Sequence, residues 1–127
     1  MSHSLERANE WLRIVQAHLL PGGRAFESHV AAGTITSLCT CGCHGFEFFI
    51  PETMQLEPLS AQPGLCCELT FGSNLEEPIH VLLFTDDRGY FAGADITLGP
   101  SNSAPMPDEA TATTLIDVWP RDNLCVA

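Results

Sequence analysis

Apolar residues recur at steps of three and four along the first part of the chain, which is the spacing of an amphipathic helix. Ser2 or Ser4 can cap the start of this helix, and the Pro-Gly-Gly sequence of residues 21–23 can end it. We therefore predict a helix over about residues 4–20, with Trp11 directed to the core. The apolar stripe consists of Leu5, Ala8, Trp11, Leu12, Ile14, Val15 and Leu19.

After Gly33 the pattern changes to alternation with period two, which is typical of strands. Two strands are predicted over residues 34–41 and 43–50, joined tightly near Gly42. In the second strand, one face is predicted to carry Phe46, Phe48 and Ile50, and the other face Glu47 and Phe49. A third strand over residues 65–71 is predicted to direct inward Leu65, Cys67, Leu69 and Phe71.

The strongest hairpin signal is the turn sequence of residues 86–89, which separates apolar runs at residues 79–84 and 90–98. Proline-rich connections precede and follow these elements at residues 51–63 and 99–109. A last strand over residues 113–119 should direct inward Leu115 and either Ile116 or Val118. This order predicts an α+β fold: one domain, residues 1–127, with an antiparallel sheet of about five to six strands over about residues 34–119, packed by the N-terminal helix.

The charge of the chain is strongly negative, because sixteen acidic residues face five arginines and no lysine, giving a net charge of −11. Such a field repels nucleic acids and anionic lipid, and it accelerates encounter with a basic partner. The absence of lysine excludes phosphate-binding P-loops and Schiff-base enzymes. The chain has neither a signal-like start nor a long apolar run, so we expect a cytoplasmic protein without membrane contact.

Half of the six cysteines lie close together, at Cys39, Cys41 and Cys43, directly before His44. In an extended strand these three thiols would project from one side, about 6–7 Å from one to the next. They could then bind zinc, with His44 as a fourth ligand if the chain turns sharply. Zinc sites usually combine two cysteine pairs, and no second pair of that kind is present. We expect structural thiols and no cofactor, with a zinc or redox site as the alternative.

A catalytic grouping is not evident, although several residues are candidates. A cysteine nucleophile would need His18, His29 or His80 brought close by the fold. Asp95 could act as a catalytic carboxylate, but an acid on an edge strand explains it as well. His80, between two aliphatic residues, is expected to be a hydrogen-bonded core or edge histidine. We predict that the protein is not an enzyme, and a small hydrolase is the third hypothesis.

Two segments together resemble a group of small uncharacterised bacterial proteins. The first is the Cys-x-Cys-Gly-Cys turn of residues 39–43 with the aromatic strand of residues 45–49, and the second is the strand pair around residues 80–84 and 89–96. The resemblance covers residues 34–98 and implies an α+β fold, without an activity. The chain departs from the pattern with Asp95, where glutamate is more common, and with His44 after the third cysteine.

In size, acidity and lack of a catalytic grouping, the chain also resembles immunity proteins that neutralise polymorphic or contact-dependent growth-inhibition toxins. That resemblance implies a basic protein toxin as partner, often a nuclease, covered by an acidic surface. Two acidic pairs flank the predicted strand of residues 79–84 and form the expected partner-binding patch. Arg7, Arg13 and Arg24 would lie away from this patch, whose members are Glu76, Glu77, Asp86 and Asp87.

Overall fold

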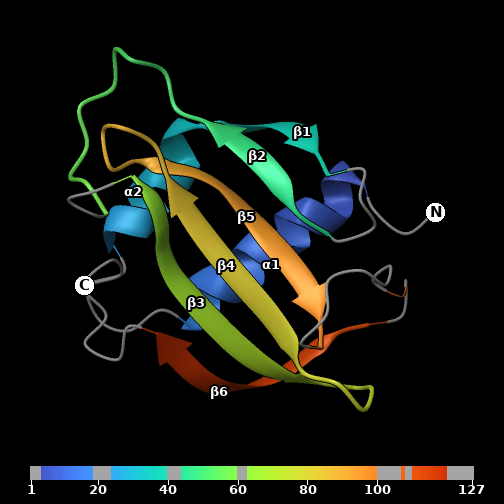
Figure 1. The fold of residues 1–127 in the computed structure, drawn as a ribbon. Helices are drawn as coiled ribbons and strands as arrows, with labels where there is room; N and C mark the ends of the chain where they lie inside the picture. Colours follow the sequence, from blue (N-terminus) through green and yellow to red (C-terminus); the bar gives the residue numbers. More distant parts are fainter. Residues whose placement is uncertain are drawn as a thin grey trace.

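The computed structural model describes residues 4–18, 24–39, 44–59, 63–99, 107 and 110–119. Within these residues the chain forms an antiparallel six-stranded sheet in the order β1-β2-β5-β4-β3-β6, with two helices on one of its faces (Figure 1). The predicted α+β architecture is confirmed. The elements are α1 (Leu5–His18), α2 (Arg24–Ala32), β1 (Thr34–Leu38), β2 (Phe46–Phe49), β3 (Gly64–Ser73), β4 (Ile79–Thr85), β5 (Phe91–Leu98) and β6 (Ala112–Trp119).

The N-terminal helix α1 forms where the apolar stripe predicts it. The Ser4 hydroxyl caps the helix by accepting a hydrogen bond from the Arg7 amide at 3.1 Å. Trp11 is 1% exposed and its indole Nε1–H donates to Nδ1 of the buried His44 at 3.2 Å. Ala8, Leu12 and Val15 are buried with Trp11 in the same core cluster. The alternative cap, Ser2, lies outside the described residues.

The second helix, α2, was not predicted. It is only nine residues long, and its buried positions Phe26 and His29 are three residues apart. The Phe26 ring packs edge-on against Phe91 of β5, with 5.0 Å between the ring centroids. Nine residues are too few for a helix to be stable alone, so packing against the sheet must hold α2 in place.

The hairpin of β4 and β5 is confirmed, and its register places β4 near the centre of the sheet. Along β4, buried Val81 and Leu83 alternate with the half-buried His80, Leu82 and Phe84. One face of β4 is therefore covered by the core, and its other face looks away from the helices.

In β3, one prediction of side-chain direction is wrong. The register shifts between Leu65, which pairs with Phe84, and Cys67, which pairs with Leu83. This bulge turns Leu65 outward, where it is 42% exposed, while Cys66 and Cys67 are both buried. Irregular register in β6 likewise leaves Ile116 62% exposed, so that Leu115 and Val118 are the residues that pack on the core.

The strands β1 and β2 pair as predicted, but they are shorter than the expected ranges of residues 34–41 and 43–50. Beyond the last pair, the amide of Cys39 donates to the carbonyl of Gly45 at 2.9 Å. The predicted turn near Gly42 lies outside the described residues, as does most of the predicted loop over residues 99–109. The faces of β2 are confirmed, with buried Phe46 and Phe48 opposite exposed Glu47 and Phe49.

Candidate functional site

The side of the sheet that faces away from α1 and α2 has no helix of the described residues over it, and we call it the open face (Figure 1). Its residues are those that alternate with the buried ones, and the strand pairing sets them in rows. One row across β5, β4, β3 and β6 contains Asp95, Leu82, Glu68 and Trp119. The next row contains Thr97, His80, Thr70 and Asp117.

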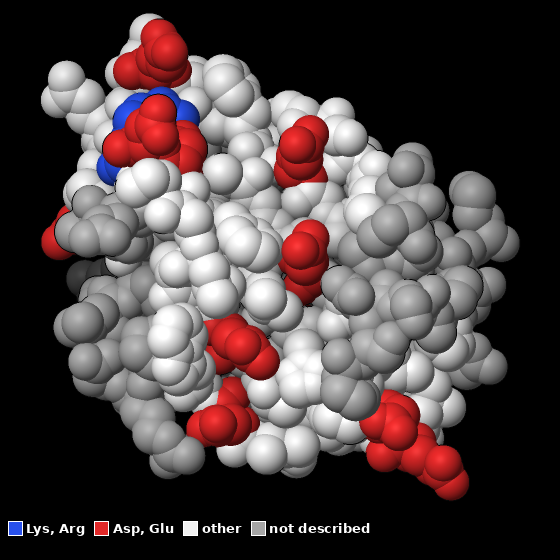
Figure 2. Space-filling model, in the orientation of Figure 1, with Lys and Arg blue, Asp and Glu red and all other residues white. Residues whose placement is uncertain are grey.

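Several of the side chains on the open face are carboxylates. Glu47 of β2 lies opposite Gly93, which is two residues from Asp95, so these two acids are diagonal neighbours about 7–8 Å apart. The outward positions of the described strands carry no arginine, and the chain has no lysine. Figure 2 shows acidic side chains over this face, with basic atoms only at the corner near the β4–β5 turn. Among the described strands, the face therefore presents carboxylates without an arginine beside them.

Large apolar side chains share the open face with these acids. Phe49 of β2 is 52% exposed and Trp119 of β6 is 55% exposed. Leu65 belongs to this face through its pairing with Phe84. Ile116 belongs to it as well, because its Cδ1 would lie 3.8 Å from a Cβ atom on the outward side of Gly72 in β3. Exposed apolar groups interspersed with charge are typical of protein-binding surfaces.

His80 and Asp95 lie at positions that correct the sequence-based interpretation. His80 is neither in the core nor at an edge, because it projects from the central strand β4 onto the open face. There its Nδ1 is 3.5 Å from Glu68 Oε2 and 3.4 Å from the Thr70 hydroxyl. Asp95 is not on an edge strand either, since β5 lies between β2 and β4.

The predicted partner-binding acids fall into two separate groups. Glu76 and Glu77 are exposed beside the β3–β4 turn, whereas Asp86 and Asp87 belong to the β4–β5 turn, at the other end of β4. The intervening strand spans about 20 Å. A standard interface of about 800 Å² per partner is about 30 Å across, so it reaches both turns only by covering the strand between them.

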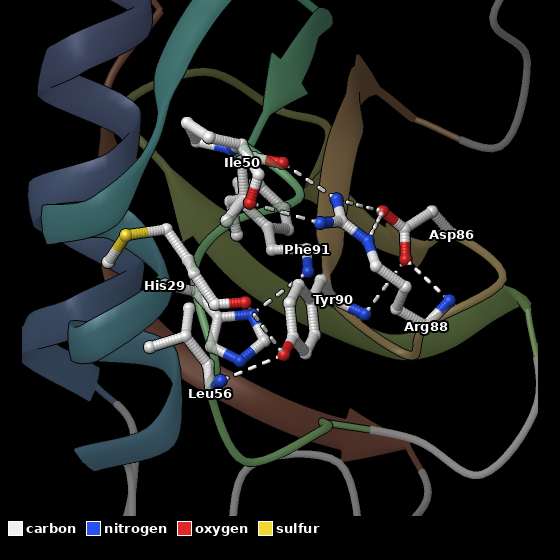
Figure 3. Close-up of polar contacts among 9 residues, drawn as sticks. His29, Ile50, Leu56, Asp86, Arg88, Tyr90 and Phe91 are labelled. Carbon is white, nitrogen blue, oxygen red and sulfur yellow. Dashed lines mark hydrogen bonds and ion pairs between the residues drawn. The ribbon is translucent and has the colours of Figure 1, made fainter.

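Of these four acids, Asp86 is engaged within the protein (Figure 3). Its Oδ1 accepts hydrogen bonds from the amides of Arg88 at 2.8 Å and Tyr90 at 3.1 Å. Its Oδ2 accepts from Arg88 Nη2 at 2.8 Å and from Arg88 Nε at 3.2 Å. The Asp86 carboxylate therefore organises its own turn, and a role of Asp86 in binding a partner stays a prediction.

Arg88 continues this network to the segment that follows β2. Its Nη2 donates to the carbonyl of Ile50 at 2.8 Å and its Nη1 to the carbonyl of Pro51 at 3.2 Å. The guanidinium also lies over the ring of Tyr90, with 4.5 Å from Cζ to the ring centroid. Arg88 thus fastens the β2–β3 connection to the β4–β5 turn.

The buried side of the network is His29, which is fully buried in α2 (Figure 3). Its Nδ1 accepts a hydrogen bond from the Phe91 amide at 3.0 Å, so the proton is on Nε2, which donates to the Glu57 carbonyl at 2.7 Å. The Tyr90 hydroxyl accepts from the Leu56 amide at 2.8 Å. Both ring nitrogens of His29 bond to backbone groups, so His29 is engaged elsewhere as one of the three candidate bases for a cysteine.

Two pKa values are shifted in this network. Burial, the largest effect, lowers the pKa of His29 below its ordinary value of 6.5, although the Glu57 carbonyl opposes the shift. For Asp86, partial burial acts to raise the pKa, but the hydrogen bonds from Arg88 and Tyr90 outweigh it and lower the pKa. His29 is thus held neutral and Asp86 charged.

The cysteine site can be judged only in part, because Cys41 and Cys43 lie outside the described residues. His44 is fully buried and accepts the Trp11 indole proton, which directs its Nδ1 into the core. Among the residues that the structure describes, no group of three or more histidine, cysteine or acidic side chains is placed to hold a metal ion. The zinc alternative therefore stays a prediction.

No protein-family model matches the sequence, and neither a curated protein nor a solved structure matches it. None of the helices in the described part of the chain has the length and apolar character needed to cross a bilayer. The carboxylates of the open face were missed as a site from the sequence. Alternation placed Glu47 with Phe49, and Glu68 with Thr70, but it does not say which side of the sheet the helices leave uncovered.

Proposed function

We propose that the protein is an immunity-type inhibitor, a cytoplasmic binding protein that neutralises a basic protein toxin by covering its active surface. The observation that carries this proposal is the open face, where Glu47, Glu68 and Asp95 lie among exposed apolar side chains. The described strands carry no arginine, and of these three acids Glu68 has His80 as a neighbour, at 3.5 Å. Three carboxylates, each within about 10 Å of the next on a sheet face, concentrate negative potential, and this concentration favours a role in binding a cationic partner.

The mechanism is stoichiometric binding. The field of a chain with a net charge of −11 accelerates encounter with a cationic surface, and the apolar side chains then exclude water from the contact. A nuclease toxin suits this surface, because its nucleic-acid-binding cleft is basic and the carboxylates take the place of phosphates. Glu76, Glu77 and Asp87, at the two ends of β4, extend the acidic rim around the open face, and Asp86 stays with Arg88.

The test is titration calorimetry and stopped-flow binding with the partner that the proposal predicts, a basic toxin domain encoded by the reading frame next to the gene of this protein. A neighbouring frame without such a domain would count against the proposal. We expect 1:1 binding whose association slows as salt rises. The variant E47Q/D95N should slow association at low salt by about tenfold.

The matched control is E27Q/E52Q, which removes two exposed charges from α2 and the loop after β2, outside the sheet. This control should change association by less than about twofold. Absence of binding, or equal slowing by both variants, would contradict the proposal.

A further inference from the structure

On the open face, each exposed aromatic side chain has a carboxylate as its neighbour. Trp119 of β6 is the cross-strand partner of Glu68, which places their Cβ atoms about 5 Å apart. Phe49 of β2 follows Glu47 by two residues, so both project from the same face about 7 Å apart. Both aromatic rings are more than half exposed. These neighbours form two carboxylate–aromatic pairs near opposite edges of the sheet.

The protein holds its own arginines with the same combination of groups. The guanidinium of Arg88 is bound by the Asp86 carboxylate and lies over the Tyr90 ring. The guanidinium of Arg7 is bound by Glu10 at 3.0 Å and lies over the ring of Trp11, 5.0 Å from its centroid. In both cases, a carboxylate accepts from the guanidinium N–H groups and the guanidinium carbon lies over an aromatic ring.

We infer that the open face recognises arginine side chains of its protein partner, through one subsite at Glu68 and Trp119 and a second at Glu47 and Phe49. This inference rests on the proposed function and specifies the chemistry of the partner. The planar guanidinium binds a carboxylate with two donors and stacks on an aromatic ring, whereas the lysine ammonium is compact and more strongly hydrated. The pairs therefore favour arginine over lysine at equal charge.

The position of Asp95 supports two arginines bound together. It lies in the same row as Glu68, with Leu82 between them, and diagonally from Glu47. The row from Asp95 to Glu68 covers two strand spacings, about 10 Å. A third carboxylate at that distance offsets the repulsion between two bound guanidinium groups. Leu82 supplies an apolar floor for the methylene stems of the arginines.

The experiment titrates the full chain with two probes, a ten-residue arginine peptide and a ten-residue lysine peptide, at physiological salt. Two-dimensional NMR follows the backbone amides of β2, β3 and β6 in every variant. In the wild-type chain it also follows the indole N–H of Trp119, which is distinguished from that of Trp11 by its loss in a Trp119→Leu variant. We expect the arginine peptide to bind at least about fivefold tighter than the lysine peptide. The Trp119→Leu substitution should remove the part of this preference that comes from the Glu68 and Trp119 subsite, and the double substitution Phe49→Leu/Trp119→Leu should remove most of it.

Two controls keep the result specific. A Glu27→Gln variant, which removes one exposed charge from α2, should leave the preference unchanged. Trp119 is 55% exposed at the end of an edge strand, so far-UV circular dichroism should show an unchanged fold in Trp119→Leu. Equal affinity of the wild-type chain for the two peptides, or a preference that survives undiminished in Phe49→Leu/Trp119→Leu, would overturn the inference.

The toxin titration separates this outcome from the fate of the proposed function. If the wild-type protein binds the toxin domain but shows no arginine preference, the inhibitor proposal stands and the arginine inference fails. If the protein discriminates the peptides but does not bind the toxin domain, the inhibitor proposal fails and the arginine preference stands as a property of the surface.

Discussion

Replacing Asp86 by asparagine should weaken the fold without weakening partner binding. The Asp86 carboxylate accepts four hydrogen bonds, two from backbone amides and two from Arg88. An asparagine can keep one acceptor oxygen toward the amides, but its other atom becomes an NH₂ donor that faces the donors of Arg88. The Arg88 side chain would then lose its hold, together with its hydrogen bonds to Ile50 and Pro51.

The expected loss in the free energy of unfolding is modest. The side chains of Asp86 and Arg88 are 31% and 30% exposed, so solvent screens the ion pair and its full charged strength does not apply. Charge-assisted hydrogen bonds of this kind contribute about 1–2 kcal/mol after that discount. For a domain of this size, such a loss lowers the melting temperature by about 3–8 °C.

Urea unfolding followed by circular dichroism, with Asp87→Asn as the control, measures this effect. Asp87 is the exposed neighbour in the same turn, and its neutralisation should cost less than about 0.5 kcal/mol. Because the folded pKa of Asp86 is lowered, its contribution is complete above the unfolded value of about 3.8. It is lost as the pH falls through the folded pKa. Equal stability of Asp86→Asn and Asp87→Asn at pH 7 would refute the assignment of Asp86 as a structural carboxylate.

Two further predictions concern the buried network and the centre of the sheet. Because the pKa of His29 is lowered, the unfolded chain takes up a proton below pH 6.5 that the folded chain does not, so stability should fall as pH drops below 6.5. Urea unfolding should show a smaller fall in the His29→Gln variant. An equal fall in the variant and the wild type would count against a neutral His29 bonded to the backbone. Gly93→Ala should cost about 2 kcal/mol or more, because φ is +151° and the new Cβ would lie 2.6 Å from the Phe46 carbonyl oxygen. Gly64→Ala, with φ of +107° and no atom within 4 Å of the new Cβ, should cost less than Gly93→Ala in a thermal melt. A larger loss of stability in Gly64→Ala than in Gly93→Ala would contradict the close approach of Gly93 to β2.

The local sequence pattern was sufficient to predict the elements whose signals lie within the element itself. The stripe around Trp11 predicted α1, and the turn at residues 86–89 predicted the β4–β5 hairpin. Period-two alternation placed Phe46 and Phe48 inward in β2. Each of these signals lies within a few residues of the position it predicts, so no knowledge of the rest of the fold is needed.

Long-range packing decided what the pattern missed. The helix α2 is short, and its His29 is fixed by backbone groups of Glu57 and Phe91, which are 28 and 62 residues away. The exposure of Leu65 results from a bulge relative to β4, and bulges leave no clear mark in a single sequence. The open face depends on strand order, which sets Glu68 between Leu82 and Trp119. No local rule connects those three positions.

The most direct test of the central claim is charge reversal on the open face. Asp95→Lys places a cation at an exposed position in the middle of the acidic face, whereas Glu27→Lys makes the same change on α2. With the predicted basic toxin domain as the titrant, calorimetry should show affinity reduced by about 100-fold or more for Asp95→Lys and by less than about threefold for Glu27→Lys. Equal affinities for the two variants, with both correctly folded, would contradict binding through the open face.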